Sequence, residues 1–478
     1  MPGTPEQKAR RQIDAALEAA GWVVQDRDDL NLGAGRGVAV REFPMKPGFG
    51  FADYLLYVDR KAVGAVEAKA ECTLSGVEPQ SAKYGAGLPD GLRAHRRPLP
   101  FLFESNGAVT YFTNQLDPVP RSRKVFGFPR PESAAELAGL AAQFRERLRH
   151  LPPLDEAGLW GVQATAIRNL EASFARGDPR ALVQMATGSG KTFTAVNVAY
   201  RLLKHAGARR ILVLVDRSNL GRQTEDEFAR FTPPDDARKF PELYTVQRLR
   251  SNALNPAAKV VVTTIQRLYS MLKGDPDLDP ASEEGSAFDT ARPWQGEPPA
   301  VAYNAALPPE TFDVIVVDEC HRSIYELWSQ VLLYFDAFLV GLTATPAPRT
   351  IGFFGQNLVM QYGHAEAVAD GVNVDYDVYR VRTRVTEHGA TIAAAEDDPV
   401  YVERRYRLTR AERLELLDAD LTYTAGQLDR DVVSESQIRT VLEQLRDRSS
   451  SAASSKRVRV SRPRALPTQV CASTRQDR

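Results

Sequence analysis

The feature that most constrains this chain is a glycine-rich loop, ATGSGKT, at residues 186–192. An apolar run at 181–185 precedes the loop, and residues 193–204 follow it with apolar side chains at helical spacing. A loop between a strand and a helix turns backbone N–H groups inward at the positive end of a helix dipole, which suits a triphosphate. We expect Lys191 to reach the β- and γ-phosphates of ATP and the Thr192 hydroxyl to bind Mg²⁺.

The other residues expected to surround the phosphates are Gly188, Ser189 and Gly190. The strict form of the pattern has one more glycine, at the position that Met185 occupies here. The alternative interpretation is a glycine turn that joins a strand to a helix and binds nothing. A second motif with phosphate chemistry, further along the chain, favours nucleotide binding.

The second motif is the acidic pair Asp318-Glu319, which follows the apolar run 314–317. Parallel strands in a doubly wound sheet share one carboxyl edge, so the pair is expected beside the glycine loop. Asp318 would hold Mg²⁺ and Glu319 would polarise the attacking water. Taken alone, the pair also fits a strand-end turn with exposed acids. Upstream, Gln163 is expected to recognise adenine through its side-chain amide. The alternative interpretation is an ordinary polar residue of a helix.

Short apolar runs alternate with helical patterns from about residue 158 onward. Nearly all-apolar strands are typical of parallel strands that are buried on both faces. The alternation predicts an α/β fold with a doubly wound parallel sheet and right-handed crossovers. A stretch rich in proline and acidic residues, 274–310, interrupts the pattern and is expected to be a surface insertion. The expected strands are 181–185, 211–215, 259–263, 313–317 and 338–342.

Composition limits the class of protein. A chain of 478 residues has room for about three domains, and no apolar run approaches the length that spans a membrane. The three cysteines lie far apart and form no CxxC pair, which indicates a reducing, cytoplasmic setting without structural zinc. The 61 basic residues balance 61 acidic ones, so DNA contacts would come from local basic patches.

A second candidate site lies in the first 150 residues. Two strand-like runs, 51–58 and 62–68, are joined by a tight polar turn and carry Asp53, Glu67 and Lys69. Glu67 and Lys69 are two positions apart and face the same side of a strand, so the three groups can converge. Two carboxylates form a hard oxygen site for Mg²⁺, and Lys69 would orient water or stabilise developing charge. The same triplet is also common on strand edges that have no catalytic role.

A helical stretch at about 77–86 carries Gln80 and Tyr84, which lie one turn apart on one face. Their amide and phenol would hold the catalytic lysine or a DNA phosphate. Strands expected at 100–104 and 109–113 flank Asn106-Gly107, a strong hairpin signal. Together these segments predict a small α/β domain that ends near residue 150.

The motifs GSGKT, DECH and TATP, in this order and spacing, resemble the first RecA-like domain of superfamily 2 helicases and translocases. With Asp53, Glu67-Ala68-Lys69 and Gln80-xxx-Tyr84 upstream, residues 1–448 resemble the R subunit of type I restriction enzymes. The resemblance implies an N-terminal PD-(D/E)xK nuclease domain ahead of the motor. It implies ATP and Mg²⁺ as cofactors and double-stranded DNA as the substrate. It also implies a complex with a methyltransferase subunit and a specificity subunit, which would recognise the DNA sequence.

On this basis we expect a PD-(D/E)xK endonuclease domain at 1–150 and a RecA-like ATP-binding domain at 151–378. Residues 379–448 are similar to the start of a second RecA-like domain, which would supply an arginine finger. Periodicity stops near residue 448, and the Ser- and Arg-rich segment 449–478 is expected to be disordered. The expectation is a truncated R subunit that binds ATP without translocating.

Two other functions fit the same residues. The chain could be a superfamily 2 DNA helicase whose upstream domain binds DNA without cutting it. It could also be an inactive, truncated partner that occupies the methyltransferase complex. Cleavage that depends on Asp53 or Lys69 would separate the nuclease from both.

Overall fold

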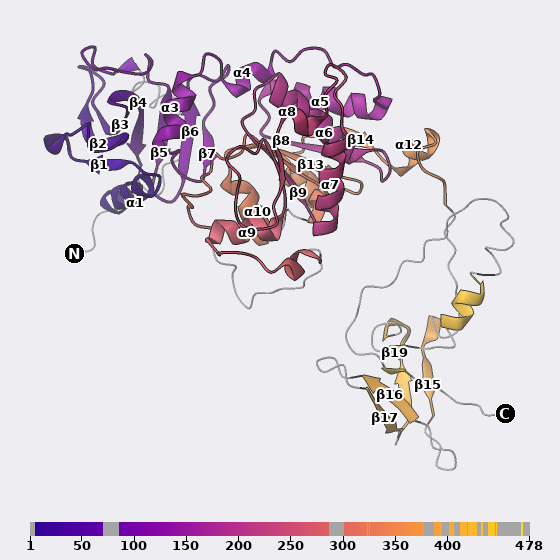
Figure 1. The fold of residues 1–478 in the computed structure, drawn as a ribbon. Helices are drawn as coiled ribbons and strands as arrows, with labels where there is room; N and C mark the ends of the chain where they lie inside the picture. The colour runs from indigo at the N-terminus through magenta and orange to yellow at the C-terminus, as the bar shows by residue number, and fades with distance from the viewer. Residues whose placement is uncertain are drawn as a thin grey trace. The chain divides into compact units, whose positions relative to one another are not determined.

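The computed structural model describes residues 5–69, 86–285, 301–322, 324 and 326–376, with shorter stretches between 387 and 446 and at 470–471. The chain forms two compact units, Met1–Asn373 and Val374–Arg478. The larger unit contains both candidate sites and is built around two seven-stranded sheets (Figure 1).

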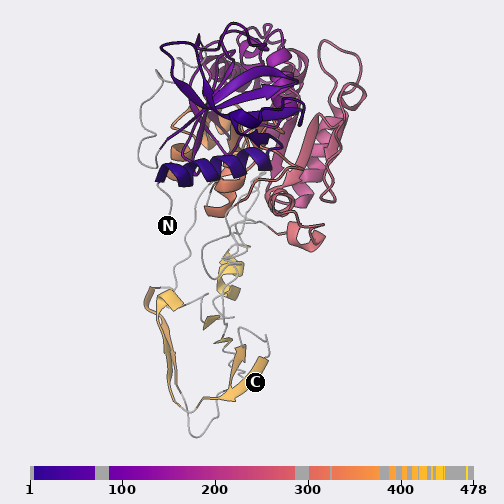
Figure 2. The ribbon, with the colours of Figure 1, turned by 90° about the vertical axis from the view of Figure 1, so that its left-hand side faces the viewer.

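The N-terminal sheet has its strands in sequence order, from β1 to β7. Strands β2, β3 and β4 are antiparallel neighbours, β4 and β5 are parallel, and β5 to β7 are again antiparallel. Helix α1 lies along this sheet (Figure 2) because its apolar stripe, which includes Ile13 and Leu17, packs into the sheet's core. The elements are α1 (Pro5–Ala19), β1 (Val23–Gln25), β2 (Gly37–Pro44), β3 (Phe51–Val58), β4 (Lys61–Ala68), β5 (Phe101–Ser105), β6 (Thr110–Asn114), β7 (Arg123–Val125), α3 (Pro131–Gly139) and α4 (Phe144–Leu148).

Both turns expected in this domain are present. Asp59 and Arg60 join β3 to β4 with φ values of 48° and 62°, the left-handed conformation of a tight turn. Asn106 and Gly107 join β5 to β6, and Asn106 Oδ1 accepts hydrogen bonds from the backbone amides of Ala108 and Val109, at 3.0 and 2.8 Å. The first turn fixes the pairing of β3 with β4, the two strands that carry the candidate nuclease residues, and the second fixes the pairing of β5 with β6.

The second sheet is entirely parallel, in the order β10-β11-β9-β12-β13-β8-β14. Helices α5 to α7 pack against one face, and helices α9 and α10 pack against the other. The expected doubly wound α/β sheet is therefore confirmed. Its strands are β8 (Arg180–Met185), β9 (Ile211–Val215), β10 (Val246–Arg248), β11 (Val260–Thr264), β12 (Val314–Val317), β13 (Phe338–Thr343) and β14 (Leu358–Tyr362). Its helices include α5 (Gly161–Arg176), α6 (Lys191–Lys204), α7 (Ser218–Arg230), α8 (Phe240–Leu243), α9 (Ile265–Lys273), α10 (Glu326–Tyr334), α11 (Pro348–Phe353) and α12 (His364–Ala369).

The stretch 274–310 is not wholly the surface insertion that its composition predicts. Leu307 is 2% exposed and belongs to the core under α9 and α10. Glu283 is also buried, and its Oε2 accepts a hydrogen bond from Arg267 Nη2 at 2.6 Å. The ion pair of Glu283 with Arg267 and the burial of Leu307 therefore hold the described parts of this stretch against the sheet.

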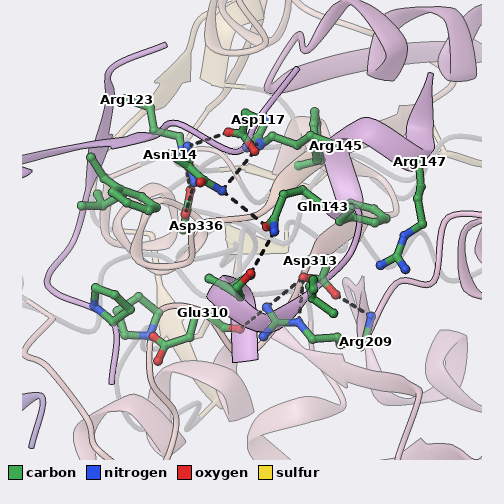
Figure 3. A pocket seen from close by; sticks show the side chains of 18 of the residues that line it. Asn114, Asp117, Arg123, Gln143, Arg145, Arg147, Arg209, Glu310, Asp313 and Asp336 are labelled. Carbon is green, nitrogen blue, oxygen red and sulfur yellow. Dashed lines mark hydrogen bonds and ion pairs between the residues drawn. The ribbon is translucent and has the colours of Figure 1, made fainter. Parts of the chain in front are cut away.

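The two sheets of the larger unit meet at a buried polar cluster, drawn in Figure 3. Arg123, on β7, donates to both carboxylate oxygens of Asp336, just before β13, at 2.8 and 2.9 Å. Arg123 also contacts Asp117 at 3.4 Å, and Arg145 contacts the same carboxylate at 3.6 Å. Burial alone would raise the pKa of Asp336, but Arg123 holds it below its usual value. The N-terminal sheet and the parallel sheet are thus joined by a half-buried, bidentate ion pair.

Asp336→Ala is expected to lower the free energy of unfolding by about 1.5–3 kcal/mol, because the half-buried Arg123 guanidinium loses two charge-assisted hydrogen bonds and keeps only its longer contact with Asp117. Chemical denaturation measures this value. Asp28→Ala is the control, because its contact with Arg27 is exposed and contributes under about 1 kcal/mol. The double variant Arg123→Met/Asp336→Leu should recover most of the loss. Equal effects of Asp336→Ala and Asp28→Ala would contradict the assignment.

In the smaller unit, the described residues form two small sheets. Strands β15 (Ala390–Ile392) and β18 (Leu421–Tyr423) pair antiparallel. The other sheet has the order β17-β16-β20-β19, and its strands are β16 (Tyr401–Arg405), β17 (Glu412–Leu416), β19 (Val432–Val433) and β20 (Val470–Cys471). Strand β20 lies within the segment that was expected to be disordered. It pairs antiparallel with β16 and parallel with β19, so these two residues depart from the expected disorder. The rest of 449–478 lies outside the described residues.

Candidate functional sites

The glycine loop connects β8 to α6 as the sequence predicts. Gly188 and Gly190 have φ values of +87° and +85°, which residues other than glycine rarely adopt. Lys191 begins α6, and its Nζ donates to the carbonyl of Met185 at 3.3 Å. The Ser189 hydroxyl donates to the Ala186 carbonyl at 2.6 Å, which tightens the loop. A lysine ammonium and the start of a helix therefore lie beside a loop of two left-handed glycines, an arrangement that suits phosphate binding.

The acidic pair lies beside this loop. Lys191 Nζ is 3.9 Å from Glu319 Oε1, and the backbone amide of Glu319 donates to Asp318 Oδ1 at 3.0 Å. Glu319 has a φ of +48°, an uncommon conformation for a residue with a side chain, of the kind that occurs at functional sites. Thr192 follows Lys191 in the first turn of α6 and is half-buried. The structure thus brings Lys191, Asp318 and Glu319 together, and Thr192 lies next to Lys191 in the chain.

Burial, and then the charge of Glu319, raise the pKa of Asp318 to about 6. The folded chain therefore binds the carboxyl proton of Asp318 more tightly than the unfolded chain. Its contribution to the free energy of unfolding is fully present below the ordinary pKa of 3.8 and is lost as the pH rises from there through 6. Without nucleotide or metal, Asp318→Asn should be more thermostable than the unchanged chain at pH 7.5, by several degrees, and this advantage should fall to about half at pH 5. Thermal unfolding across this range measures the difference.

Asp236→Asn is the control for this pH dependence, because Arg238 lowers the pKa of Asp236 to about 2. Its effect should not change between pH 5 and pH 7.5. A gap between Asp318→Asn and the unchanged chain that stays constant with pH would contradict the assignment.

Further contacts continue from this site into the sheet. His321 Nδ1 lies 3.5 Å from Glu319 Oε2 and 3.0 Å from the hydroxyl of Thr343, at the end of β13. Thr343 Oγ1 also accepts from the amide of Thr345 at 3.2 Å. The sequence motifs DECH and TATP therefore touch. Buried Asp216, to which the sequence analysis gave no role, accepts from Arg322 at 3.2 Å and lies next to the same motif.

Gln163 contacts the glycine loop directly. Its Nε2 donates to the Ser189 carbonyl at 3.1 Å, and its Oε1 accepts from the Trp160 amide at 3.0 Å. The residue is 4% exposed. Adenine recognition by this amide stays a prediction, and it would require the base to replace one of these bonds or to reach the remaining amide hydrogen.

Asp53 lies where β3 and β4 approach the end of their pairing. Its Oδ2 accepts from the backbone amide of Ala68 at 2.8 Å, and its Oδ1 accepts from Arg10 Nη2 at 2.9 Å. Ala68 stands between Glu67 and Lys69 in the sequence. The structure therefore ties Asp53 to the strand segment that carries the other two candidate residues.

Glu67 and Lys69 contact each other, since Lys69 Nζ donates to Glu67 Oε1 at 2.5 Å. Glu67 Oε2 is buried and has no hydrogen-bond partner among the described residues. Glu104, equally buried, lies directly opposite Glu67 in the β4–β5 register. An orphaned carboxylate oxygen beside a second acid fits a hard divalent cation. No group of three or more His, Cys, Asp or Glu side chains in the described parts of the chain is placed to share one ion.

The predicted residues Gln80 and Tyr84 lie outside the described residues. The sequence analysis missed Arg10 and Glu104 as neighbours of this site. The pairing of β4 with β5 could have identified Glu104, because each strand carries an acidic residue one position before its last. No signal in the sequence connects Arg10 to a carboxylate 43 positions away.

Comparison with known proteins agrees with the arrangement of the second sheet. Residues 158–348 match a protein-family model described as the type III restriction enzyme, res subunit. This range contains the glycine loop and the acidic pair. The described residues include no helix that is both long and apolar enough to cross a membrane.

The curated relatives are endonuclease subunits of type I restriction enzymes. The EcoKI endonuclease subunit of Escherichia coli strain K12 is 26% identical over 461 residues, which covers 82% of this chain and 37% of that protein. The EcoAI endonuclease subunit of Escherichia coli is also 26% identical, over 85% of this chain and 48% of that protein. The chain thus spans less than half the length of either relative. It is homologous to these subunits over most of its own length.

Among solved structures, a fragment described as the HsdR subunit of a type I restriction enzyme from Vibrio vulnificus YJ016 aligns with 77% of this chain and 61% of its own. Its sequence identity is 20% and its TM-score is 0.31. The helicase domain of Hef from Pyrococcus furiosus aligns with 41% of this chain and 38% of its own, at 22% identity and a TM-score of 0.26.

Proposed function

We propose that this chain is the DNA-cutting and ATP-hydrolysing R subunit of a type I restriction system. The observation that carries the proposal is that one compact unit holds both a triphosphate loop beside an acidic pair and a Glu67–Lys69 pair tied to Asp53. Its substrate would be double-stranded DNA. Its partners would be a methyltransferase subunit and a specificity subunit. The domain limits are those proposed from the sequence, a nuclease at 1–150 and a RecA-like domain at 151–378.

In the ATP site, each residue has a proposed task. The amides of Gly188, Ser189 and Gly190 and the Lys191 ammonium bind the phosphates. Thr192 and Asp318 hold Mg²⁺, and Glu319 orients water for attack on the γ-phosphate. The contact between His321 and Thr343 then links this site to β13.

In the nuclease site, Asp53 and Glu67 would hold a divalent cation, which when bound supplies Lewis-acid stabilisation of the scissile phosphate. Lys69 is close enough to Glu67 to orient the attacking water or to donate to the phosphate. Gln80 and Tyr84 are proposed to position Lys69 or a DNA phosphate. The buried, unpaired Oε2 of Glu67 supports a cation at this place.

The test is cleavage of plasmid DNA by the full chain, alone and with the two partner subunits, in the presence of Mg²⁺ and ATP. Cleavage that disappears in Lys69→Ala while the chain still binds ATP would support the proposal. Cleavage that persists unchanged in Lys69→Ala would contradict the nuclease assignment.

One observation favours a second candidate, a helicase whose upstream domain does not cut DNA. Both oxygens of Asp53 already accept hydrogen bonds, one from Arg10 and one from Ala68. A carboxylate committed in this way could be purely structural. Wild-type cleavage in Asp53→Asn, together with normal ATP hydrolysis, would favour this reading.

A further inference from the structure

The side chain of Arg10 connects helix α1 to the candidate nuclease site. Its Nη2 donates to Asp53 Oδ1 at 2.9 Å, and its Nη1 donates to Glu42 Oε1 at 2.5 Å. The side chains of Arg10 and Asp53 are 34% and 19% exposed, so the ion pair lies at the rim of the site. A DNA backbone that reaches Asp53 would therefore meet this guanidinium.

The backbone is adapted to hold this contact. Glu42 has a φ of +50°, and the regular pairing of β2 with β3 skips this residue, since Arg41 pairs with Tyr54 and Phe43 with Ala52. A left-handed glutamate inside a strand is costly and persists where the surroundings over-determine it. Here the Glu42 carboxylate accepts a hydrogen bond from Arg10.

Anchoring of α1 does not explain the contact. The helix is already held by Ile13 and Leu17, which are fully buried in the sheet's core. Its Asp14 also accepts from Arg41 Nη2 at 3.0 Å and from the Tyr54 hydroxyl at 2.8 Å. Arg10 adds a second, more exposed ion pair, and this pair ends on a proposed metal ligand.

Each of the two proposed metal ligands is paired with a cationic side chain in this structure. Asp53 and Glu67 are acids on neighbouring strands, and Lys69 pairs with Glu67. Arg10 compensates Asp53 in the same manner. A divalent cation that binds Asp53 must compete with the guanidinium for the same oxygen, because Oδ2 is held by the amide of Ala68.

We propose that Arg10 is a further residue of the nuclease site, which neutralises Asp53 in the metal-free chain and binds a DNA backbone phosphate once a divalent cation holds Asp53. The inference rests on the proposed nuclease function. Glu42 keeps the guanidinium at the rim during the exchange, and a guanidinium fork matches two phosphate oxygens. Arg10 would thus exchange one anion for another without leaving its position.

The first measurement is Mn²⁺ binding to the full chain by calorimetry, without nucleotide or DNA. Arg10→Gln should bind Mn²⁺ about three- to tenfold more tightly, because it removes the competing cation. Arg41→Gln is the matched control, since Arg41 joins the same helix to the same sheet without touching Asp53, and it should leave the affinity unchanged. A purely structural role of Arg10 predicts no tightening.

The second measurement is the salt dependence of binding to a short DNA duplex in Ca²⁺, a hard cation of the same charge. Loss of one phosphate contact in Arg10→Gln should reduce the slope of log affinity against log salt concentration by about one. Arg10→Lys keeps the charge and should restore the slope. This variant also keeps the test usable if Arg10→Gln folds poorly.

An unchanged Mn²⁺ affinity in Arg10→Gln overturns the proposal, and so does an unchanged salt slope. Asp53→Asn and Glu67→Gln test the underlying site separately, because each should abolish or strongly weaken Mn²⁺ binding. If both variants bind Mn²⁺ normally, the nuclease function fails whatever Arg10 does. If they lose Mn²⁺ and Arg10→Gln binds it with unchanged affinity, only the inference about Arg10 fails.

Discussion

Replacing Lys191 by alanine should reduce ATP hydrolysis by at least about a hundredfold, and it should weaken ATP binding as well. The reason is its position, since the ammonium lies at the first residue of α6, beside the glycine loop and 3.9 Å from Glu319. Removal of one preorganised donor to a phosphoryl group typically costs two to three orders of magnitude in rate. The measurement is phosphate release by the full chain with DNA and Mg²⁺, together with the affinity for a fluorescent ATP analogue.

Lys204→Ala is the matched control for Lys191→Ala, because it removes a lysine from the other end of the same helix. Lys204 contacts Asp235 at 2.8 Å on the surface, away from the loop. Its loss should leave both ATP affinity and phosphate release within about twofold of the unchanged chain. Comparable losses in the two variants would mean that a damaged helix, rather than a missing phosphate ligand, explains the result.

Glu67→Gln should reduce DNA cleavage by at least about a hundredfold while ATP hydrolysis stays normal. The substitution keeps the size of the side chain and removes the negative charge that pairs with Lys69 and that would hold the cation. Loss of a metal ligand or of its supporting group commonly costs ten- to hundredfold in metal affinity alone. The two activities should separate because Glu67 lies in the N-terminal sheet and the ATP site lies on the parallel sheet.

Plasmid nicking, measured with the partner subunits present, gives the cleavage rate for Glu67→Gln. Glu132→Gln, at an exposed position on α3, is the control and should cut at the normal rate. Normal cleavage by Glu67→Gln would leave the buried carboxylate as a structural group. Loss of both cleavage and ATP hydrolysis would instead indicate misfolding.

Local patterns predicted most of the fold that positions the two sites. The strand expected at 51–58 is β3, and the one expected at 211–215 is β9, because a turn or a polar segment limits each apolar run. The edge strands β10 and β14 were missed. Both strands are short or polar, and they form by pairing with the neighbouring strand. Such pairing produces no clear pattern in the sequence.

The candidate ATP site was predictable because its residues follow one another along the chain at strand ends. Contacts made by tertiary packing were not. Gln163 meets Ser189 across 26 positions and Arg10 meets Asp53 across 43, and neither distance follows from periodicity. The burial of Glu283 was not predictable for a related reason. An acidic residue in a proline-rich stretch is expected at the surface, and only the tertiary structure shows the arginine that pairs with it.

The bidentate pair between Arg123 and Asp336 has a mechanical consequence. This ion pair restrains the N-terminal sheet against the parallel sheet, so the two proposed sites should keep a nearly constant separation. The proposed nuclease site would then not move independently toward distant DNA. The duplex would have to be delivered to it. The position of the cut would then depend on the path that the duplex follows over the protein surface.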